Sequence, residues 1–314
     1  MYKVAVLTRN FEQYRRLFER LLEAQPDLPL QLDYYGQNPQ EQIPLDTQIL
    51  LANPNYAAQV VDRLPNLAWL QSTWAGVRPI CDQNKRHFQL TGLKNVFGEQ
   101  MREYTFTHIL NHARKTALLG EQQRARQWQQ PVPIDITGKT LGISGLGNIG
   151  QGVAEAAKAF GMRVISLNAS SSPKLADQCF FSHNKIAFAK QCDYYLNLMP
   201  DTDMSKGLCD AEFIAALPNH AVLINAGRGS LISDDQMLID SLDQNQLAHA
   251  VLDVFKQEPL PQEHPFWTHE KVTVTQHTAA LSTADKVFSV FKRNLSAFIA
   301  GKPLADQVDF DKGY

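Results

Sequence analysis

Short apolar runs alternate with longer segments of helical periodicity along most of the chain. KVAVLT (3–8), TQILLAN (47–53) and LAWLQST (67–73) each have the length and composition of a buried strand. Between the first two, residues 11–24 carry apolar side chains three and four positions apart, as one face of a helix requires. Strands that alternate with helices in this way are typical of parallel β-α-β units.

A second series of apolar runs occupies the later part of the chain. Its members are KTLGISGLG (139–147), RVISLN (163–168), DYYLNLMP (193–200), AVLINAG (221–227), AHAVLDVF (248–255) and KVTVTQH (271–277). A long helical stretch at 98–128 separates the two series, and a last helix within 282–304 ends at a Gly-Lys-Pro turn. We therefore expect an α/β fold with two doubly wound parallel-sheet lobes, one comprising 1–97 and 285–314 and the other comprising 98–284.

Composition narrows the classes of function. The 314 residues fit about two domains, and 30 basic against 32 acidic residues leave no basic surplus for nucleic acid. The N-terminus lacks the apolar core of a signal peptide, and no run reaches the roughly 20 apolar residues of a membrane span. We expect a cytoplasmic protein with neither a nucleic-acid nor a membrane partner.

Signals for a metal site are weak. The four cysteines show no metal-ligand spacing, and we expect free thiols. His108 and His112 lie four apart on a predicted helix, but no third ligand is evident nearby. We expect no metal and interpret this pair as helix surface.

A glycine-rich loop follows the first strand of the second series. Gly145, Gly147 and Gly150 fit the G-x-G-x-x-G pattern, directly after a strand and at the start of a helix. Three glycines alone could form an ordinary turn, but this context favours dinucleotide binding, with the pyrophosphate at the helix N-terminus. Asn148 and Ile149 complete the expected loop contacts.

The position expected to bind the adenosine ribose carries no acid. An Asp or Glu about 20 residues further along normally holds the 2′-hydroxyl of NAD, whereas here Asn168 follows the strand. Asn168, Ser170 and Lys174 could tolerate or bind a 2′-phosphate. We expect NADP or NAD, with NADP slightly preferred; a polar loop that discriminates poorly is the alternative.

Three polar residues each follow a strand of the second series. Arg228 ends LINAGR, Glu258 follows VLDVFKQ, and His277 follows VTVTQ. Ligands of open α/β sheets bind beyond the carboxyl ends of strands, so the three could converge. Arginine can bind a carboxylate with two parallel hydrogen bonds, and a carboxylate beside histidine favours its charged form. Each also has a plainer interpretation. Arg228 could cap a helix or form a structural ion pair, and Glu258 could be a solvated loop acid. His277 differs from the other histidines only in its position at the end of a strand.

These motifs together resemble the D-isomer-specific 2-hydroxyacid dehydrogenase family. NAGRG, LDVFKQEPLP, HPFW and HTAA occur in the order and spacing of that family, as do GKTLGISGLGNIG and LPNLAWLQSTWAGV. The ending QVDFDKGY and GEQMREY look most like the glyoxylate/hydroxypyruvate reductase A branch. The resemblance implies a Rossmann-type nucleotide lobe and a flavodoxin-like substrate lobe with a cleft between them.

The implied reaction is NAD(P)H-dependent reduction of a small 2-keto acid to the D-2-hydroxy acid. By resemblance, Arg228 would bind the substrate, His277 would donate the proton, and Glu258 would orient His277. The loop of Ala75, Gly76 and Val77 would bind the carboxylate through its amides, with Trp74 as an apolar wall, although a core position for Trp74 is as plausible. Further expected cofactor contacts are Met199, Pro200, Ala226, Gly227, Asp253 and Ala280.

Some features depart from the family pattern or leave another function open. Gln276 stands where proline commonly precedes the catalytic histidine, and Ala169 stands where NADP-using relatives often have arginine. Glu258 argues against formate oxidation, because that branch usually has glutamine there. An NAD(H)-sensing protein-interaction module of the same fold is the alternative function. The family also implies a homodimer, with residues 99–115 and 127–133 near the interface.

Overall fold

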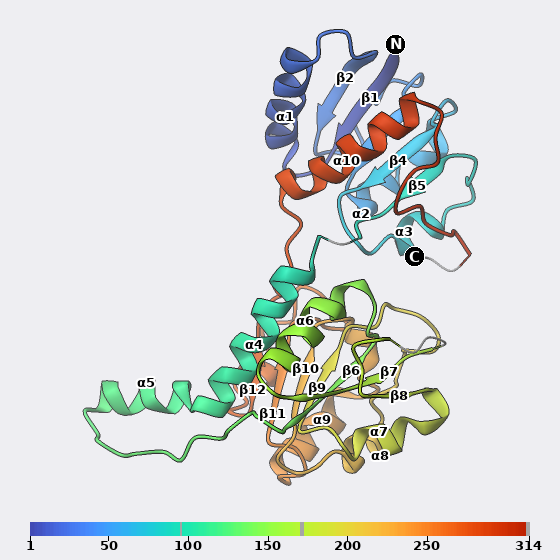
Figure 1. The fold of residues 1–314 in the computed structure, drawn as a ribbon. Coiled ribbons are helices and arrows are strands. Elements are labelled where there is room, and N and C mark those ends of the chain that lie inside the picture. Colours follow the sequence, from blue (N-terminus) through green and yellow to red (C-terminus); the bar gives the residue numbers. More distant parts are fainter. Residues whose placement is uncertain (95, 170–172, 312–314) are drawn as a thin grey trace. The chain divides into compact units, whose positions relative to one another are not determined.

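The computed structural model describes residues 1–94, 96–169 and 173–311. The chain divides into two compact units: unit 1 comprises Met1–Val96 and Ser282–Tyr314, and unit 2 comprises Phe97–Leu281. Each unit contains one parallel sheet with flanking helices, which confirms the expected fold class (Figure 1). Within the described ranges, no helix is long and apolar enough to cross a membrane.

Unit 1 is built on a five-stranded parallel sheet. Its elements are β1 (Tyr2–Leu7), α1 (Phe11–Ala24), β2 (Leu30–Gly36), β3 (Ile49–Ala52), α2 (Pro54–Ala57), β4 (Trp69–Ser72), α3 (Arg78–Cys81), β5 (Gln89–Thr91) and α10 (Ala284–Ile299). The strand order is β2-β1-β3-β4-β5. Phe18 of α1 packs edge-on against Phe288 and Phe291 of α10, and Trp69 stacks on Phe291. Helices α1 and α10 therefore cover one face of the sheet together.

The hydrophobic pattern does not predict the two outer strands of this sheet. β2 has the sequence LQLDYYG, and most of its residues are only half-buried because it pairs with a single neighbour, β1. β5 has three residues, of which Gln89 is exposed. Neither strand contains the continuous apolar run of a strand buried on both faces.

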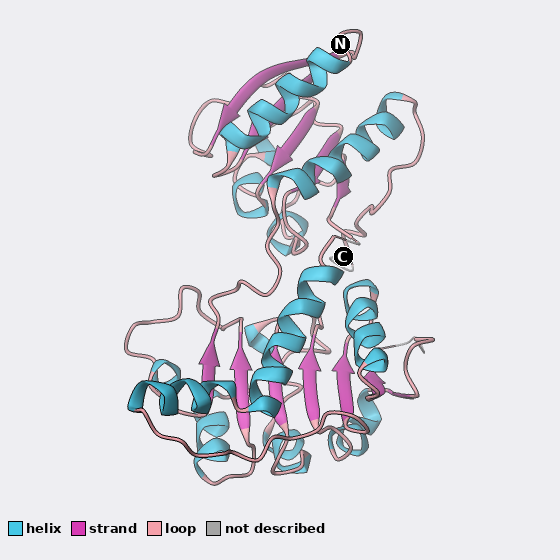
Figure 2. Cartoon of the chain, turned by 60° about the vertical axis from the view of Figure 1, so that its left-hand side comes forward, coloured by secondary structure: helices cyan, strands magenta, loops and turns pink. Residues whose placement is uncertain are grey.

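Unit 2 is built on a seven-stranded parallel sheet, whose strands point the same way in Figure 2. Its elements are α4 (Gly98–Arg114), α5 (Thr116–Ala125), β6 (Thr140–Ser144), α6 (Asn148–Ala159), β7 (Arg163–Leu167), β8 (Gln178–Phe180), α7 (Lys185–Ala189), β9 (Tyr194–Asn197), α8 (Ala211–Ala216), β10 (Val222–Asn225), α9 (Asp235–Asp243), β11 (His249–Leu252) and β12 (Val272–Val274). The order β12-β11-β10-β9-β6-β7-β8 includes the short edge strand β8, which the sequence pattern does not predict. The chain reverses direction across the sheet between β6 and β9, and ligands of such sheets bind at this point.

The helical stretch expected at 98–128 consists of two helices, α4 and α5, and ends at Ala125. It is broken at Lys115, whose φ of 56° is left-handed and whose amide donates to the carbonyl of His112. A left-handed residue ends an α-helix by redirecting the chain, so α5 starts in a new direction. Figure 1 shows α5 extending away from the sheet of unit 2.

Candidate active site

His277 and Glu258 form a close pair beyond the carboxyl ends of β11 and β12. His277 Nδ1 lies 2.7 Å from Glu258 Oε2, and the Phe255 amide donates to Glu258 Oε1 at 2.9 Å. One carboxylate oxygen is thus held by the backbone while the other holds the imidazole. Because Nδ1 faces Glu258, Nε2 is the nitrogen left to exchange a proton with a ligand.

The pair shifts the pKa of each member. The hydrogen bond to Glu258 raises the pKa of His277, and the charges of Glu258 and Asp253 add to this effect against burial and the Arg228 charge. Burial alone would raise the pKa of Glu258, but the hydrogen bonds from His277 and Phe255 with the nearby positive charges lower it. Both shifts favour an ion pair of imidazolium and carboxylate.

The two glycines beside Arg228 let three loops pack together. A Cβ on Gly227 would collide with Asn197 and Met199 after β9, and a Cβ on Gly229 would overlap the backbone of Phe255 after β11. Without side chains, these positions place the Arg228 loop between the ends of β9 and β11. Packing therefore requires glycine on both sides of Arg228.

Two buried asparagines fix the turn that carries Arg228. Asn197 Nδ2 donates to Asn225 Oδ1 at 2.8 Å, and Asn225 Nδ2 donates to the Arg228 carbonyl at 2.9 Å. Both side chains are inaccessible to solvent. The sequence analysis gave them no role, although each is a buried amide at the end of a buried strand, a pattern that the sequence shows.

The Arg228 guanidinium remains available for a ligand. Its Nη1 donates to the carbonyl of Gly227 at 2.7 Å, and within the described part of the chain it forms no ion pair. The alternative interpretation of Arg228 as part of a structural ion pair is therefore wrong for the described residues. The charge of Arg228 acts on both Glu258 and His277, so the three residues lie in one electrostatic environment.

The glycine loop has the geometry that a dinucleotide requires. Gly145 has a φ of 80°, and a Cβ there would lie 3.0 Å from the Met199 amide. A Cβ on Gly150 would lie 2.9 Å from Leu146, whereas open space surrounds Gly147. Helix α6 begins at Asn148 with no side-chain cap. Uncapped amides and open space above Gly147 fit the pyrophosphate of a bound NAD(P).

The other residues expected to contact the cofactor differ in burial and in their place in the fold. Asn168 is buried, and its Nδ2 donates to the Leu146 carbonyl at 3.3 Å, so this side chain contacts the glycine loop. Lys174 is exposed, and Ser170 lies outside the described residues. The remaining residues follow the ends of β9, β10, β11 and β12: Met199, Pro200, Ala226, Gly227, Asp253 and Ala280.

The expected carboxylate loop lies in unit 1, at the end of β4. Ala75, Gly76 and Val77 precede α3, and their amides have no hydrogen-bond acceptor within the described residues. Trp74 is 44% exposed, so a core position for it is wrong. That this loop and the residues of unit 2 meet in one cleft stays a prediction.

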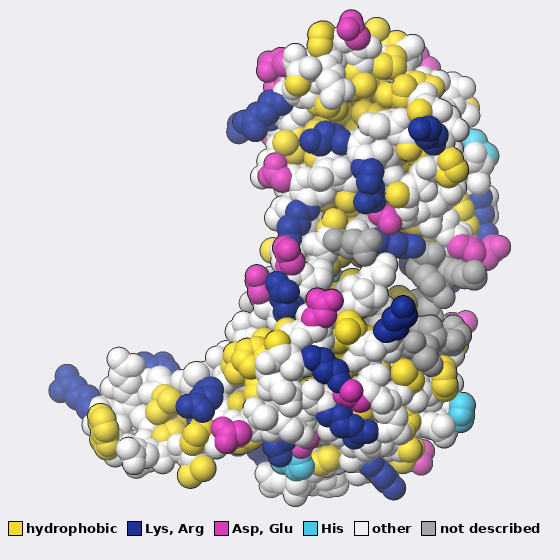
Figure 3. All heavy atoms as spheres, viewed as in Figure 1, with side chains coloured by type: hydrophobic (Ala, Val, Ile, Leu, Met, Phe, Trp, Pro, Cys, Tyr) yellow, Lys and Arg dark blue, Asp and Glu magenta, His cyan; other side chains and the backbone are white. Residues whose placement is uncertain are grey.

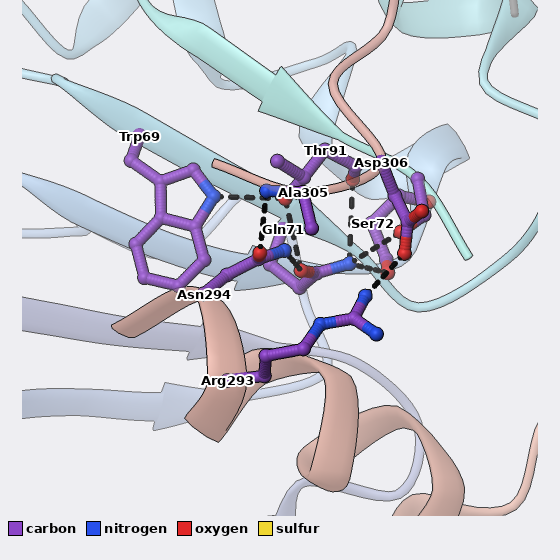
Figure 4. Close-up of polar contacts among 9 residues, drawn as sticks. Trp69, Gln71, Ser72, Thr91, Arg293, Asn294, Ala305 and Asp306 are labelled. Carbon is purple, nitrogen blue, oxygen red and sulfur yellow. Dashed lines mark hydrogen bonds and ion pairs between the residues drawn. The ribbon is translucent and has the colours of Figure 1, made fainter. Parts of the chain in front are cut away.

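A buried polar network holds the end of β4 in place (Figure 4). Gln71 donates to the carbonyls of Ser72 and Gly92, while its Oε1 accepts from Thr91 and from Asn294 of α10. The Ser72 hydroxyl in turn bonds the backbone of Trp74. The loop therefore starts from a rigid base, which the sequence pattern did not identify.

The interpretation of His108 and His112 as helix surface is wrong. Both are half-buried; burial lowers the pKa of His108 and lowers that of His112 to about 4. His112 Nδ1 lies 3.4 Å from the Tyr194 hydroxyl. Among the described residues, no group of three or more His, Cys, Asp or Glu side chains could hold a metal ion.

Comparisons with known proteins agree on one family. The sequence model of the D-isomer specific 2-hydroxyacid dehydrogenase NAD binding domain matches residues 106–279. The glyoxylate/hydroxypyruvate reductase A of Serratia proteamaculans is 37% identical over 220 residues, or 69% of each chain.

Solved structures extend the similarity to both units. A D-isomer specific 2-hydroxyacid dehydrogenase family protein from Aeromonas salmonicida has a TM-score of 0.89 and 34% identity, covering 99% of both chains. The NADPH-dependent glyoxylate/hydroxypyruvate reductase of Sinorhizobium meliloti, solved with NADP and sulfate, has a TM-score of 0.84 and 25% identity over 100% of both chains.

The fold and these similarities define an NAD(P)-dependent oxidoreductase of the 2-hydroxyacid dehydrogenase class. The chain belongs to the D-isomer specific 2-hydroxyacid dehydrogenase family, and the predicted resemblance is confirmed.

Proposed function

We propose that this enzyme reduces a small 2-keto acid of the glyoxylate or hydroxypyruvate type to the D-2-hydroxy acid. The observation that carries the proposal is the His277–Glu258 pair at 2.7 Å beside an Arg228 guanidinium that forms no ion pair with a described carboxylate. Relatives named for reduction of glyoxylate and hydroxypyruvate support the substrate class. Unit 2 would hold the dinucleotide, and unit 1 would contribute the carboxylate loop.

Each residue has a distinct part in the proposed reaction. Arg228 binds the keto acid by directing its fork of N–H groups at the carboxylate and the carbonyl oxygen. His277 donates a proton from Nε2 to that oxygen while Nδ1 stays bonded to Glu258. Glu258 stabilises the imidazolium before transfer and keeps the ring oriented. The amides of Ala75, Gly76 and Val77 would bind the carboxylate. The nicotinamide cofactor supplies the hydride.

NADPH is the proposed preferred cofactor. Asn168 places no negative charge beside the ribose, so it does not repel a 2′-phosphate. Lys174 is exposed and could bind that phosphate. The Sinorhizobium meliloti relative is NADPH-dependent by name, which supports this preference.

A homodimer is the proposed assembly. Apolar side chains are exposed on α5 and the segment after it, including Leu118, Leu119, Val132 and Trp128, which is 92% exposed. Hydrophobic side chains are visible over this projecting segment in Figure 3. Exposed apolar clusters of this kind are typical of interaction surfaces. Light scattering should give twice the 35.3 kDa mass of one chain, and a mass equal to one chain would contradict the dimer.

Absorbance at 340 nm tests the function directly. Glyoxylate, hydroxypyruvate, pyruvate and phenylpyruvate are each supplied with NADPH or NADH. We expect turnover with glyoxylate or hydroxypyruvate, and faster turnover with NADPH. Faster turnover with NADH would refute the cofactor preference alone. Cofactor binding without turnover of any acid would refute the reductase and favour the NAD(H)-sensing alternative.

A further inference from the structure

The loop that carries His277 has a backbone that needs outside support. Gln276 and His277 both have a φ of 57°, a left-handed conformation that residues other than glycine seldom adopt. Two such residues in succession persist only where neighbouring groups determine the conformation. The His277 amide donates to the backbone carbonyl of Asp253 at 2.6 Å, so support comes from the end of β11.

Asp253 also holds the rest of this loop through its carboxylate. Its Oδ1 accepts the Thr275 hydroxyl at 2.7 Å and the Thr278 amide at 2.8 Å, and its Oδ2 accepts the Ala279 amide at 3.1 Å. The side chain is 1% exposed and forms no ion pair with any described residue. A buried carboxylate without an ion-pair partner depends on the position of every hydrogen-bond donor.

Tyr104 of α4 supports one of these donors, Thr275. Its hydroxyl lies 2.8 Å from Thr275 Oγ1. Thr275 has one hydroxyl proton and directs it at Asp253, so its oxygen accepts from Tyr104. Burial raises the pKa of Tyr104, which keeps the phenol protonated and able to donate. The bonds therefore run in one direction, from Tyr104 to Thr275 to Asp253.

We propose that Tyr104 is a positioning residue for the reduction, which fixes His277 against Glu258 through Thr275 and Asp253. This inference rests on the proposed role of His277 as proton donor. Tyr104 touches neither reacting group: it anchors the loop to a helix packed on the sheet. If the phenol hydroxyl is removed, Thr275 loses its hydrogen-bond donor and no longer holds the Asp253 carboxylate in a fixed position. The left-handed segment of Gln276 and His277 then becomes less restricted.

The direction of the effect on pH dependence follows from the groups that face His277. Glu258 and Asp253 raise the pKa of His277, while burial and the charge of Arg228 lower it. His108, whose ring centroid lies 4.5 Å from that of Tyr104, also faces the Asp253 charge. A looser loop weakens the contacts with both carboxylates, so the pKa of His277 should fall toward its ordinary value.

The test compares Tyr104→Phe with Tyr194→Phe. Tyr194 is a matched control because its hydroxyl also faces α4, through His112, and has no bond to the loop. Proton NMR of the free full-length protein gives the titration of His277, whose ring signal is assigned by its absence from the spectrum of His277→Gln.

Steady-state kinetics give kcat and KM. We expect Tyr104→Phe to lower the pKa of His277 and reduce kcat about fivefold, the effect of one hydrogen bond. Tyr194→Phe should leave both unchanged.

A double-mutant cycle tests the route through Thr275. If Tyr104 acts through Thr275, Tyr104→Phe should have almost no effect on kcat in a Thr275→Val background, while Thr275→Ser should retain wild-type behaviour. Additive effects would overturn the proposal, as would an unchanged His277 titration in Tyr104→Phe. The titration needs no substrate, so a fall in the pKa of His277 without any keto-acid turnover would refute the proposed function but support the link from Tyr104 to His277.

Discussion

At the scale of single residues, the site depends on which nitrogen of His277 can release a proton. Glu258 occupies Nδ1 and is itself fixed by the Phe255 amide, so the ring has one free nitrogen and a restricted orientation. A residue with this environment can be charged at neutral pH and still donate. Glu258 therefore has two separable effects, on the charge of the imidazole and on its orientation.

Glu258→Gln should shift the pH profile of reduction toward acid. The pKa of His277 is raised by Glu258, so the protonated form needed for reduction is present at low pH and is lost as pH rises through that pKa. The amide removes the negative charge, which lowers the pKa of His277. The falling limb of kcat/KM against pH should therefore move to lower pH, and an unmoved limb would show that the pair does not set the charge.

Arg228→Ala should affect the keto acid and leave cofactor binding intact. Loss of a charged hydrogen-bonding fork should reduce kcat/KM about 10- to 100-fold. The kcat/KM of Arg228→Lys should lie between those of the wild type and Arg228→Ala, because lysine retains only the charge. Cofactor affinity is measured by quenching of protein fluorescence. Collapse of that affinity with normal turnover would move Arg228 out of the substrate site.

At the scale of elements, the site is formed where loops after β9, β10 and β11 pack against one another. Gly229 is the tightest of these contacts, because a Cβ would overlap the Phe255 backbone. The motif around Arg228 could be read from the sequence as functional. The steric reason for its second glycine, Gly229, could not be read from the sequence. Phe255 lies 26 positions further along, and only the strand order of the sheet brings Gly229 and Phe255 together.

Gly229→Ala should destabilise unit 2 by about 1–3 kcal/mol, as overpacking of rigid backbone does. Gly120→Ala is the matched control. Gly120 lies within α5 with nothing within 4 Å of an added Cβ, so alanine there should stabilise the protein by up to about 1 kcal/mol. Urea unfolding measures both. Equal stabilities of Gly229→Ala and wild type would show that the loops can separate without cost.

Sequence pattern predicted buried elements better than exposed or broken ones. The strands of unit 2 that carry the site lie within mostly apolar runs, and each was predicted to within a few residues. β2, β5 and β8 were missed because edge strands need no such run. The break at Lys115 was missed because lysine gives no signal for a left-handed turn, and Tyr104 because its partner Thr275 lies 171 positions away.

At the scale of the whole molecule, family membership and site geometry support each other. The family model covers residues 106–279, which include Arg228 and Glu258 and extend past His277. The similarity to solved structures extends to unit 1, where the rigid end of β4 precedes the expected carboxylate loop. The central claim is that His277 supplies the proton in reduction of a 2-keto acid.

The measurement that tests this claim most directly is turnover of glyoxylate and hydroxypyruvate by His277→Gln beside the wild type, with cofactor affinity measured on the same samples. Loss of a general acid should reduce kcat about 10²- to 10⁴-fold. Cofactor affinity should remain unchanged, since His277 is proposed to act on the substrate. A variant that retains kcat within about threefold of wild type, well short of the loss expected for a general acid, would contradict the claim.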